Sequence, residues 1–361
     1  MIGLVFGGES CEHDISVITA LSTYNAIKNK IKITLIYMKN GSFYVGEKLS
    51  EINSYKQFST KGLKKAYFEN GEIIVGNGVF RKREKVEAVV MCNHGGAGEN
   101  GSLSGYFETV GIPYSASNPV GSGICMDKAF AKALLEKFKF PTVNYRIFRE
   151  CYDVGKLSDI EYPVIIKPAR NGSSVGVSYA KDKDELIKGI EYALSFDDKL
   201  IIEKALQNFR EFNCAAFDGE NGVVVSDVEE VVSENKFLNF DDKYMSSDSA
   251  EHKIPADIAY KLRDKIMRIT KEIYLLFELK GVVRVDFLYA DNKLFVNEIN
   301  TIPGSMASYL FKSKEVTYPD LIESLIDAAK RSYDSRHKLA SDFASDVLKN
   351  FDGVKSDWIK K

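Results

Sequence analysis

Four polar side chains lie in an otherwise apolar stretch, residues 281–304, where their types and spacing could support chemistry. Arg284 and Asp286 belong to one strand-like run, and Glu298 and Asn300 belong to the next. Charged groups inside a sheet are costly unless they are paired, hydrogen-bonded or bound to a metal. Because residues two positions apart project from the same face of a strand, each run presents a polar pair on one face.

We expect these two runs to form a hairpin with a three-residue loop, residues 291–293. In that register Asp286 faces Glu298 across the hairpin. Arg284 then faces Asn300, and a two-residue loop would break both pairings unless a bulge restored them. Two carboxylates and an amide oxygen suit Mg²⁺, and an adjacent arginine suits a developing anion. The alternative is a salt-bridge cluster on a surface hairpin.

A second candidate is segment 163–177, a strand followed by a Gly/Ser-rich turn and another strand. Backbone N–H groups of such a turn cradle phosphates, and Lys167 adds a positive charge. The segment lacks the G-x-x-x-x-G-K-[ST] pattern and does not lead into a helix, which excludes a P-loop. The alternative is an ordinary Gly-rich hairpin.

Two further loops, residues 7–14 and 94–101, each follow an apolar run that predicts a buried strand. Open α/β sheets bind ligands at the carboxyl ends of their parallel strands. Glu12 in the first loop could hold an ammonium group. His94 in the second could contact a carboxylate or orient a neighbour, although a buried structural histidine is the common alternative.

The elements that must position these residues follow a β-α-β order. Apolar runs at 2–6, 33–37 and 86–91 predict strands of an N-terminal open parallel α/β sheet, and helical spacing predicts a helix over 17–27. Residues 40–85 are polar and hairpin-like, and we expect them to form a peripheral insertion. The overall class is α/β.

Bulk composition describes an ordinary globular enzyme. The chain has 361 residues, 45% of them hydrophobic, and a formal net charge of −2, which gives no electrostatic case for nucleic acid. The first residues do not resemble a signal peptide, and no apolar run approaches the ~20 residues that a membrane span needs. Five scattered cysteines fit reduced thiols. We therefore expect a cytoplasmic protein without membrane contact.

Taken together and in order, these motifs resemble the D-alanine–D-alanine ligase family of ATP-grasp enzymes. The resemblance runs from about residue 2 to about residue 328. It rests on seven motifs: Gly7-Gly-Glu-Ser with Glu12, His94-Gly-x-x-Gly-Glu-x-Gly101, Met126-Asp-Lys128, Lys167-Pro with Gly172-Ser-Ser174, Lys243-Tyr244, Arg284-x-Asp286, and Glu298-x-Asn-Thr-x-Pro-Gly304.

The resemblance implies a three-domain ATP-grasp architecture in which ATP is held between the central and C-terminal domains. We expect an N-terminal substrate domain over 1–117, a central domain over 118–200, a C-terminal domain with the metal site over 201–330, and a helical tail over 331–361. The implied activity is ATP-dependent joining of two D-alanines through an acyl phosphate, for peptidoglycan precursor synthesis. The family also favours homodimers.

The resemblance further implies roles for individual residues. ATP phosphates would be contacted by Lys128 and Lys167 and covered by a turn that includes Ser174 and Val175. The rest of the nucleotide would be contacted by Glu203, Lys204, Leu206 and, at the ribose, Glu211. Two Mg²⁺ ions, or Mn²⁺, would be held by Asp286, Glu298 and Asn300.

At the substrates, the resemblance implies that Glu12 holds the first D-alanine and is linked to Ser173 and Tyr244. Lys243 would sit over the transferred phosphate, on a loop that closes the site. The oxyanion hole would consist of Arg284 and the backbone N–H of Gly304.

One position departs from the family pattern. Where the family has a serine for the second substrate's carboxylate, ungapped counting places Tyr309, followed by Leu310, and Ser308 fits only if the turn is one residue shorter. A phenol occupies far more volume than a serine. The alternatives are therefore a ligase with another second substrate (D-serine, D-lactate or another amino acid) or a catalytically silent nucleotide-binding homologue.

Overall fold

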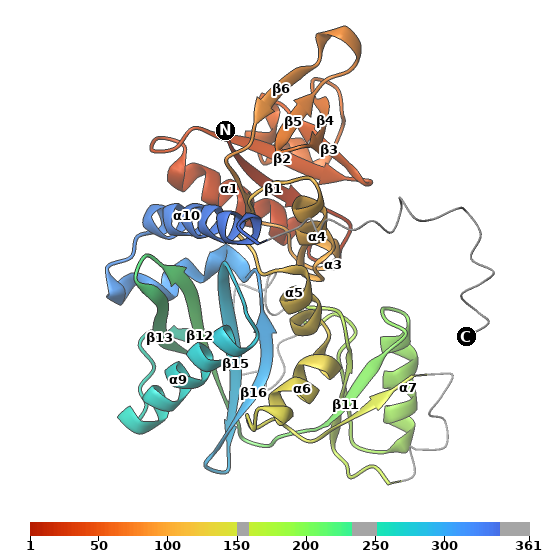
Figure 1. Ribbon diagram of the computed structural model, residues 1–361. Helices are drawn as coiled ribbons and strands as arrows, with labels where there is room; N and C mark the ends of the chain where they lie inside the picture. The colour runs from red at the N-terminus through yellow and green to blue at the C-terminus, as the bar shows by residue number, and fades with distance from the viewer. Residues whose placement is uncertain (150–158, 233–250, 340–361) are drawn as a thin grey trace, which may run out of the picture.

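The computed structural model of this protein describes residues 1–149, 159–232 and 251–339, and these form three β-sheets with helices packed against them (Figure 1). Lys243 and Tyr244 lie outside the described residues. None of the helices within these ranges combines the length and the apolar character that crossing a bilayer requires.

The N-terminal sheet has seven strands. Their spatial order is β6 (Lys82–Lys85), β5 (Glu72–Val75), β4 (Lys64–Glu69), β3 (Ser42–Val45), β2 (Ile33–Lys39), β1 (Ile2–Gly7) and β7 (Ala88–Met91). The parallel pairs in this sheet are β1 with β2 and β1 with β7. The strands β3 to β6 pair antiparallel, so residues 42–85 extend the predicted parallel sheet rather than standing apart from it.

Helices and tight turns bring the ends of β1 and β7 together. All six residues of β1 are buried, and α1 (His13–Ile27) packs against this strand. Gly7 ends β1 with a φ of +84°, and a Cβ there would lie 2.5 Å from the Met38 carbonyl oxygen, so only glycine fits. After β7 come α3 (Gly96–Glu99) and α4 (Ser102–Thr109). Short helical turns η1 (Glu47–Ser50), α2 (Asn53–Lys56) and η2 (Gly78–Phe80) lie between the outer strands.

The second sheet has four antiparallel strands in the order β10 (Ser178–Ala180), β9 (Val164–Pro168), β11 (Leu200–Lys204) and β8 (Tyr145–Phe148). It is reached through α5 (Pro119–Met126) and α6 (Lys128–Lys137), and α7 (Lys183–Leu194) packs against it (Figure 1). Because β11 pairs with both β9 and β8, the expected boundary at 200/201 would cut this sheet. We propose that the central domain ends after Lys204.

The third sheet carries the predicted polar hairpin. Its order is β14 (Glu251–Lys253), β13 (Gly222–Val232), β12 (Arg210–Gly219), β15 (Val282–Ala290) and β16 (Lys293–Asn300), with every pair antiparallel. Helix α9 (Tyr260–Leu276) covers one face, where Val283, Val285 and Phe287 pack into the core. The alternate residues of β15 therefore point to the opposite face, which holds the polar side chains.

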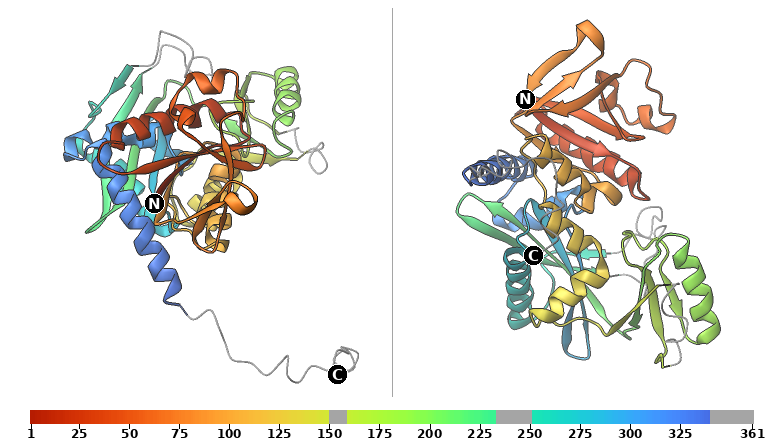
Figure 2. Two further views of the ribbon diagram at one scale, coloured as in Figure 1. Left: turned by 90° about the horizontal axis from the view of Figure 1, so that it is seen from above. Right: turned by 45° about the vertical axis from the view of Figure 1, so that its right-hand side comes forward.

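The end of the described chain returns to the first sheet. After β16 follow η4 (Gly304–Lys314) and α10 (Tyr318–His337), and α10 lies between the first and third sheets (Figures 1 and 2). Its buried residues Leu321, Ile322 and Leu325 belong to the same apolar cluster as Leu4 and Val5 of β1. One continuous helix spans the expected boundary at 330/331, so we propose that the C-terminal domain extends at least to His337.

Candidate active site

The polar hairpin of β15 and β16 has the predicted pairing but a different turn. Asp286 pairs with Glu298, and Arg284 pairs with Asn300. The prediction of a three-residue loop is wrong, because Ala290 pairs with Lys293 and leaves a two-residue turn. The register is restored by a bulge in β16, which leaves Asn297 as an extra residue between the positions opposite Asp286 and Phe287.

Asp286 is the centre of a buried hydrogen-bonded group on this hairpin. Arg284 binds its carboxylate through two N–H groups, Nε to Oδ1 at 2.6 Å and NH2 to Oδ2 at 2.8 Å, and Asn300 Nδ2 donates to Oδ2 at 3.0 Å. Burial opposes the charge on Arg284, but the attraction of Asp286 outweighs it and raises the pKa of the guanidinium well above its usual value. The arginine is therefore a fixed cation.

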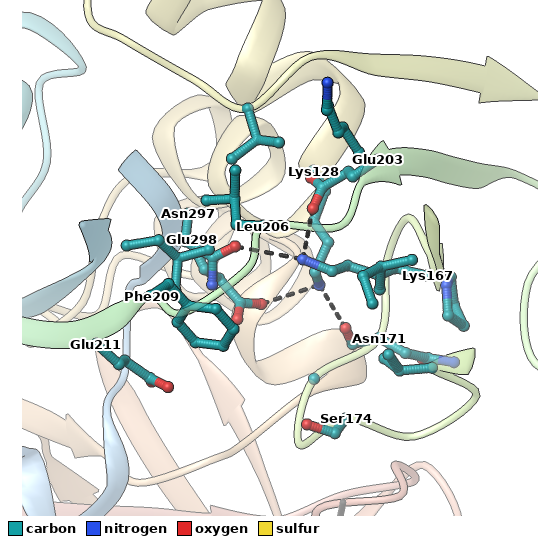
Figure 3. A pocket seen from close by; sticks show the side chains of 17 residues that line it. Lys128, Lys167, Asn171, Ser174, Glu203, Leu206, Phe209, Glu211, Asn297 and Glu298 are labelled. Carbon is teal, nitrogen blue, oxygen red and sulfur yellow. Dashed lines mark hydrogen bonds and ion pairs between the residues drawn. The ribbon is translucent and has the colours of Figure 1, made fainter. Parts of the chain in front are cut away.

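The face of the hairpin opens into a pocket between the second and third sheets (Figure 3). Predicted residues that line it are Lys128, Lys167, Ser174, Glu203, Lys204, Leu206, Glu211 and Glu298. Lining residues that the sequence analysis did not select include Val143, Ile165, Phe209, Leu288 and Asn297. Apolar groups thus gather beside a cluster of charged groups, as expected for a ligand with a flat ring at one end and phosphates at the other.

Two lysines extend toward the acidic hairpin from different elements (Figure 3). Lys128, at the start of α6, lies 2.9 Å from Glu298 Oε1 and donates to the Asn171 carbonyl oxygen at 2.6 Å. Lys167, on β9, donates to Asn297 Oδ1 at 3.3 Å. The bulge makes this last contact possible, because it turns the neighbouring residues Asn297 and Glu298 to the same pocket.

Glu203 fixes the position of Lys167 from the floor of the pocket. Its carboxylate lies 2.6 Å from Lys167 Nζ and 2.8 Å from Lys132 Nζ, and its side chain is only 3% exposed. Burial opposes ionisation of Glu203, but the two ammonium groups outweigh it and lower its pKa to about 2. Since this side chain is committed to the lysines, only the backbone of Glu203 is left to meet a ligand.

The Gly/Ser turn after β9 reaches across to the first loop of the N-terminal sheet. Ser173 Oγ donates a hydrogen bond to Glu12, which joins two segments 161 residues apart. A Cβ at Gly172 would lie 2.6 Å from Glu12 Oε2, so the approach requires glycine. Ser173 and Ser174 both have positive φ, 52° and 58°. Val175 closes the turn by a backbone hydrogen bond to Gly172 but does not line the pocket.

Glu99 lies near Glu12 and connects the second loop to the segment after β16 by hydrogen bonds. It accepts hydrogen bonds from the backbone N–H groups of Gly95 at 2.7 Å and Ile302 at 3.2 Å. Burial, with repulsion from Glu12, raises the pKa of Glu99 to about 8. The sequence motif contains this residue, but no role was predicted for it.

His94 is a buried part of the same junction. Its Nε2 lies 2.9 Å from Thr19 Oγ1, which also accepts a hydrogen bond from the backbone N–H of Ser305 at 3.3 Å. Ser305 follows Gly304, and the three residues from Ser305 to Ala307 all have positive φ, between 47° and 52°. His94 thus supports a strained turn through Thr19. The space beside Gly304 is open, since a Cβ added there would meet no atom within 4 Å.

We expect His94 to make the folded protein less stable at acid pH. Burial lowers the pKa of His94 to about 4 from its usual 6.5. Its contribution is therefore complete above pH 6.5 and is lost as pH falls from 6.5 to 4, by about 3 kcal/mol in all. Urea unfolding at several pH values should show that the difference in stability between the wild type and His94→Gln shrinks over this range. A pH-independent difference would contradict the buried neutral histidine.

The position that departs from the family pattern lies beside Arg284. Tyr309, on η4, donates to Glu229 Oε2 at 3.3 Å. The positive charge of Arg284 acts to lower the pKa of both side chains. Leu310 is fully buried in the apolar core, so its side chain cannot meet a substrate, and Ser308 is partly buried. The partner Glu229 lies 80 residues from Tyr309 in sequence, which no local pattern reveals.

Two protein-family descriptions match this chain in order. Residues 1–117 match the family described as D-ala D-ala ligase N-terminus, and residues 134–327 match the family described as D-ala D-ala ligase C-terminus. The D-alanine–D-alanine ligase of Thermosipho melanesiensis is 34% identical over 365 residues, covering 96% of this chain and 98% of that protein.

Solved structures agree with the fold. The D-alanine–D-alanine ligase of Coxiella burnetii has a TM-score of 0.82 at 24% identity, over 93% of this chain and 95% of that one. The VanG D-Ala:D-Ser ligase of Enterococcus faecalis has a TM-score of 0.79 at 27% identity, over 91% and 98%. With both family matches in order and a relative similar over nearly its whole length, the chain belongs to the D-alanine–D-alanine ligase family and has its ATP-grasp fold.

Proposed function

We propose that this protein is an ATP-dependent D-alanine–D-alanine ligase, which supplies the dipeptide for peptidoglycan precursors in the cytoplasm, as a homodimer. The observation that carries the proposal is the position of Glu298. This residue lines the pocket with Lys128 and faces Asp286 across the hairpin, so one carboxylate joins the pocket to a second acidic group. Relatives similar over nearly their whole length are named D-alanine–D-alanine ligase, so nothing favours a catalytically silent homologue.

The pocket between the second and third sheets is the proposed ATP site. The apolar side chains of Ile165, Leu206, Phe209 and Leu288 suit an adenine ring, with the backbone of Glu203 to Leu206 at its edge and Glu211 near the ribose. Lys128 would turn from Glu298 to the phosphates, and Lys167 would turn from Asn297 while Glu203 keeps its contact with it. The turn over residues 172–175 would cover them with backbone N–H groups.

The acidic hairpin is the proposed magnesium site. Asp286, Glu298 and Asn300 offer carboxylate and amide oxygens, the donors that Mg²⁺ prefers, and Arg284 and Lys128 lie against the two carboxylates. We propose that Asp286, Glu298 and Asn300 would hold two divalent cations. When bound, such ions neutralise charge on the transferring phosphoryl group.

The first D-alanine would lie between the N-terminal sheet and the hairpin. Glu12, which Ser173 already orients, would bind its ammonium group, and His94 would act by positioning the turn at Ser305 through Thr19. The carboxylate of this substrate would attack the terminal phosphate of ATP, forming an acyl phosphate and ADP. The roles expected for Lys243 and Tyr244 fall outside the described residues.

The second step is the attack of an amine on that acyl phosphate. The negative oxygen that develops would be stabilised by the guanidinium of Arg284 and the backbone N–H of Gly304, and phosphate would leave. Arg284 is well suited to this role because its charge is fixed and Asp286 holds its orientation. The second D-alanine would lie toward Tyr309, with Ser308 and the backbone of Leu310 nearby.

Incubation of the protein with ATP, Mg²⁺ and D-alanine tests the proposal. We expect ADP, phosphate and D-alanyl-D-alanine in equal amounts, identified by product mass, and no product from L-alanine. ADP release without a D-alanyl product, or no ADP at all, would refute the assigned activity.

A further inference from the structure

Three side chains contact the buried carboxylate of Glu229 on the polar face of the third sheet, and one of them, His252, is half exposed. Asn213 Nδ2 lies 2.8 Å from Oε2, the Tyr309 hydroxyl lies 3.3 Å from the same oxygen, and His252 Nδ1 lies 2.6 Å from Oε1. The side chain of Glu229 is 0% exposed. All three partners can donate a hydrogen bond, and an arrangement of donors around both oxygens suits the ionised carboxylate.

The charge state of Glu229 follows from these contacts. Burial opposes its ionisation, but the hydrogen bonds from His252 and Asn213 outweigh it, and the net pKa is lowered. An ionised carboxylate has no proton to give. The Tyr309 hydroxyl must therefore donate to Glu229, which leaves its oxygen lone pairs as acceptors for anything else that approaches.

Asn213 adds to the excess of acceptors. Because Glu229 is anionic, Asn213 must turn its Nδ2 toward it, which fixes the direction of the amide. Its Oδ1 is buried and finds no hydrogen-bond donor among the described residues. Because leaving a buried acceptor without a donor is unfavourable, the cluster is short of hydrogen-bond donors.

The cluster lies in line with the proposed metal site. Glu229 pairs with Asn213, Asn213 with Asp286, and Asp286 with Glu298, so the four occupy one row across β13, β12, β15 and β16. With neighbouring strands about 4.8 Å apart, Glu229 is about 14 Å from Glu298, on the side away from the nucleotide pocket. A substrate that attacks the acyl phosphate from the side opposite ATP would arrive here, near Arg284.

We propose that Glu229 determines the specificity for the second substrate by making this subsite an acceptor for an ammonium group. The inference rests on the proposed function. Glu229 accepts the Tyr309 hydroxyl proton, so the lone pairs of the Tyr309 oxygen are left to accept a hydrogen bond from the ammonium group of an amino acid. A hydroxy acid such as D-lactate has no ammonium group to donate to this oxygen. A serine at this position would donate a hydrogen bond to the substrate carboxylate. The Tyr309 hydroxyl does not, because its proton is donated to Glu229.

The test compares Glu229→Gln with Glu230→Gln. Glu230 is the next residue of β13, on the opposite face, where Arg210 binds its carboxylate at 2.6 and 2.8 Å. Both changes remove the charge of a paired glutamate. We expect Glu229→Gln to raise the KM for D-alanine at the second site about tenfold or more and to lower the product ratio of D-alanyl-D-alanine to D-alanyl-D-lactate about tenfold in competition. The KM for ATP should stay within about twofold in both variants.

A second variant keeps the test sharp if Glu229→Gln does not fold, as judged by thermal unfolding. Tyr309→Phe retains Glu229 and removes only the acceptor oxygen, and it should shift the product ratio in the same direction. An unchanged ratio in the variants that fold, an equal shift in Glu230→Gln, or a wild type that prefers D-lactate would overturn the inference while leaving D-alanine activation intact. A wild type that makes no D-alanyl product would refute the proposed function itself, and the subsite assignment with it.

Discussion

Replacing Glu298 by glutamine is expected to lower kcat by at least about 10³-fold. The variant keeps the size of the side chain but loses a charge that lines the proposed nucleotide pocket and faces Asp286 across the hairpin. A single remaining carboxylate cannot hold the proposed divalent ions in place, and charge neutralisation by metal typically contributes several kcal/mol to such a transfer. Steady-state ADP release with D-alanine and saturating Mg²⁺ measures the loss.

A matched change in the same hairpin provides the control. Asp291 is an exposed turn residue with positive φ, a conformation that asparagine also tolerates, so Asp291→Asn should leave kcat within about twofold. If Glu298→Gln kept wild-type turnover with Mg²⁺, the hairpin could not be the metal site.

The second large effect is expected from Arg284→Lys, which should lower kcat about 10²-fold or more. Lysine keeps the charge, but it cannot make the two parallel N–H contacts to Asp286 that orient the guanidinium. Removal of one oriented donor from an oxyanion site typically costs about 10²–10³ in rate. Because Arg284 does not line the nucleotide pocket, the KM for ATP should change by less than about threefold.

The control for this variant is Arg83→Lys. Arg83 also contacts two carboxylates, those of Glu69 and Glu72, but it lies on the exposed edge strand β6 of the first sheet. Such surface pairs contribute little, so its activity should be that of the wild type. Equal losses in the two variants, or an Arg284→Lys defect confined to the KM for ATP, would remove the arginine from the second step.

Local patterns predicted the parts of the site that lie close together in sequence. The alternation of apolar and polar residues in 281–300 predicts which side chains share a face, and the pairing of Asp286 with Glu298 is confirmed. The buried run at residues 2–6 predicts β1, and through it the place of Glu12 beside the sheet.

The sequence could not predict features set by register or by long-range packing. The hairpin turn is one residue shorter than expected, and only the bulge at Asn297 keeps the acidic pair aligned. That bulge also brings Asn297 to Lys167, a contact that strict alternation forbids. Tertiary pairing likewise brings Glu229 to His252 and Tyr309, and no local spacing connects these three. Phe209 could have been predicted only from being an aromatic residue between Leu206 and Glu211, two positions expected to contact the nucleotide.

The most direct test of the account follows oxygen atoms rather than rates. If the carboxylate of D-alanine attacks ATP, then D-alanine labelled with oxygen-18 in its carboxyl group must pass one labelled oxygen to each phosphate released. Mass spectrometry of the phosphate formed during dipeptide synthesis should therefore show one labelled oxygen per phosphate. Unlabelled phosphate alongside dipeptide would contradict an acyl phosphate, and with it the assignment of the acidic hairpin to phosphoryl transfer.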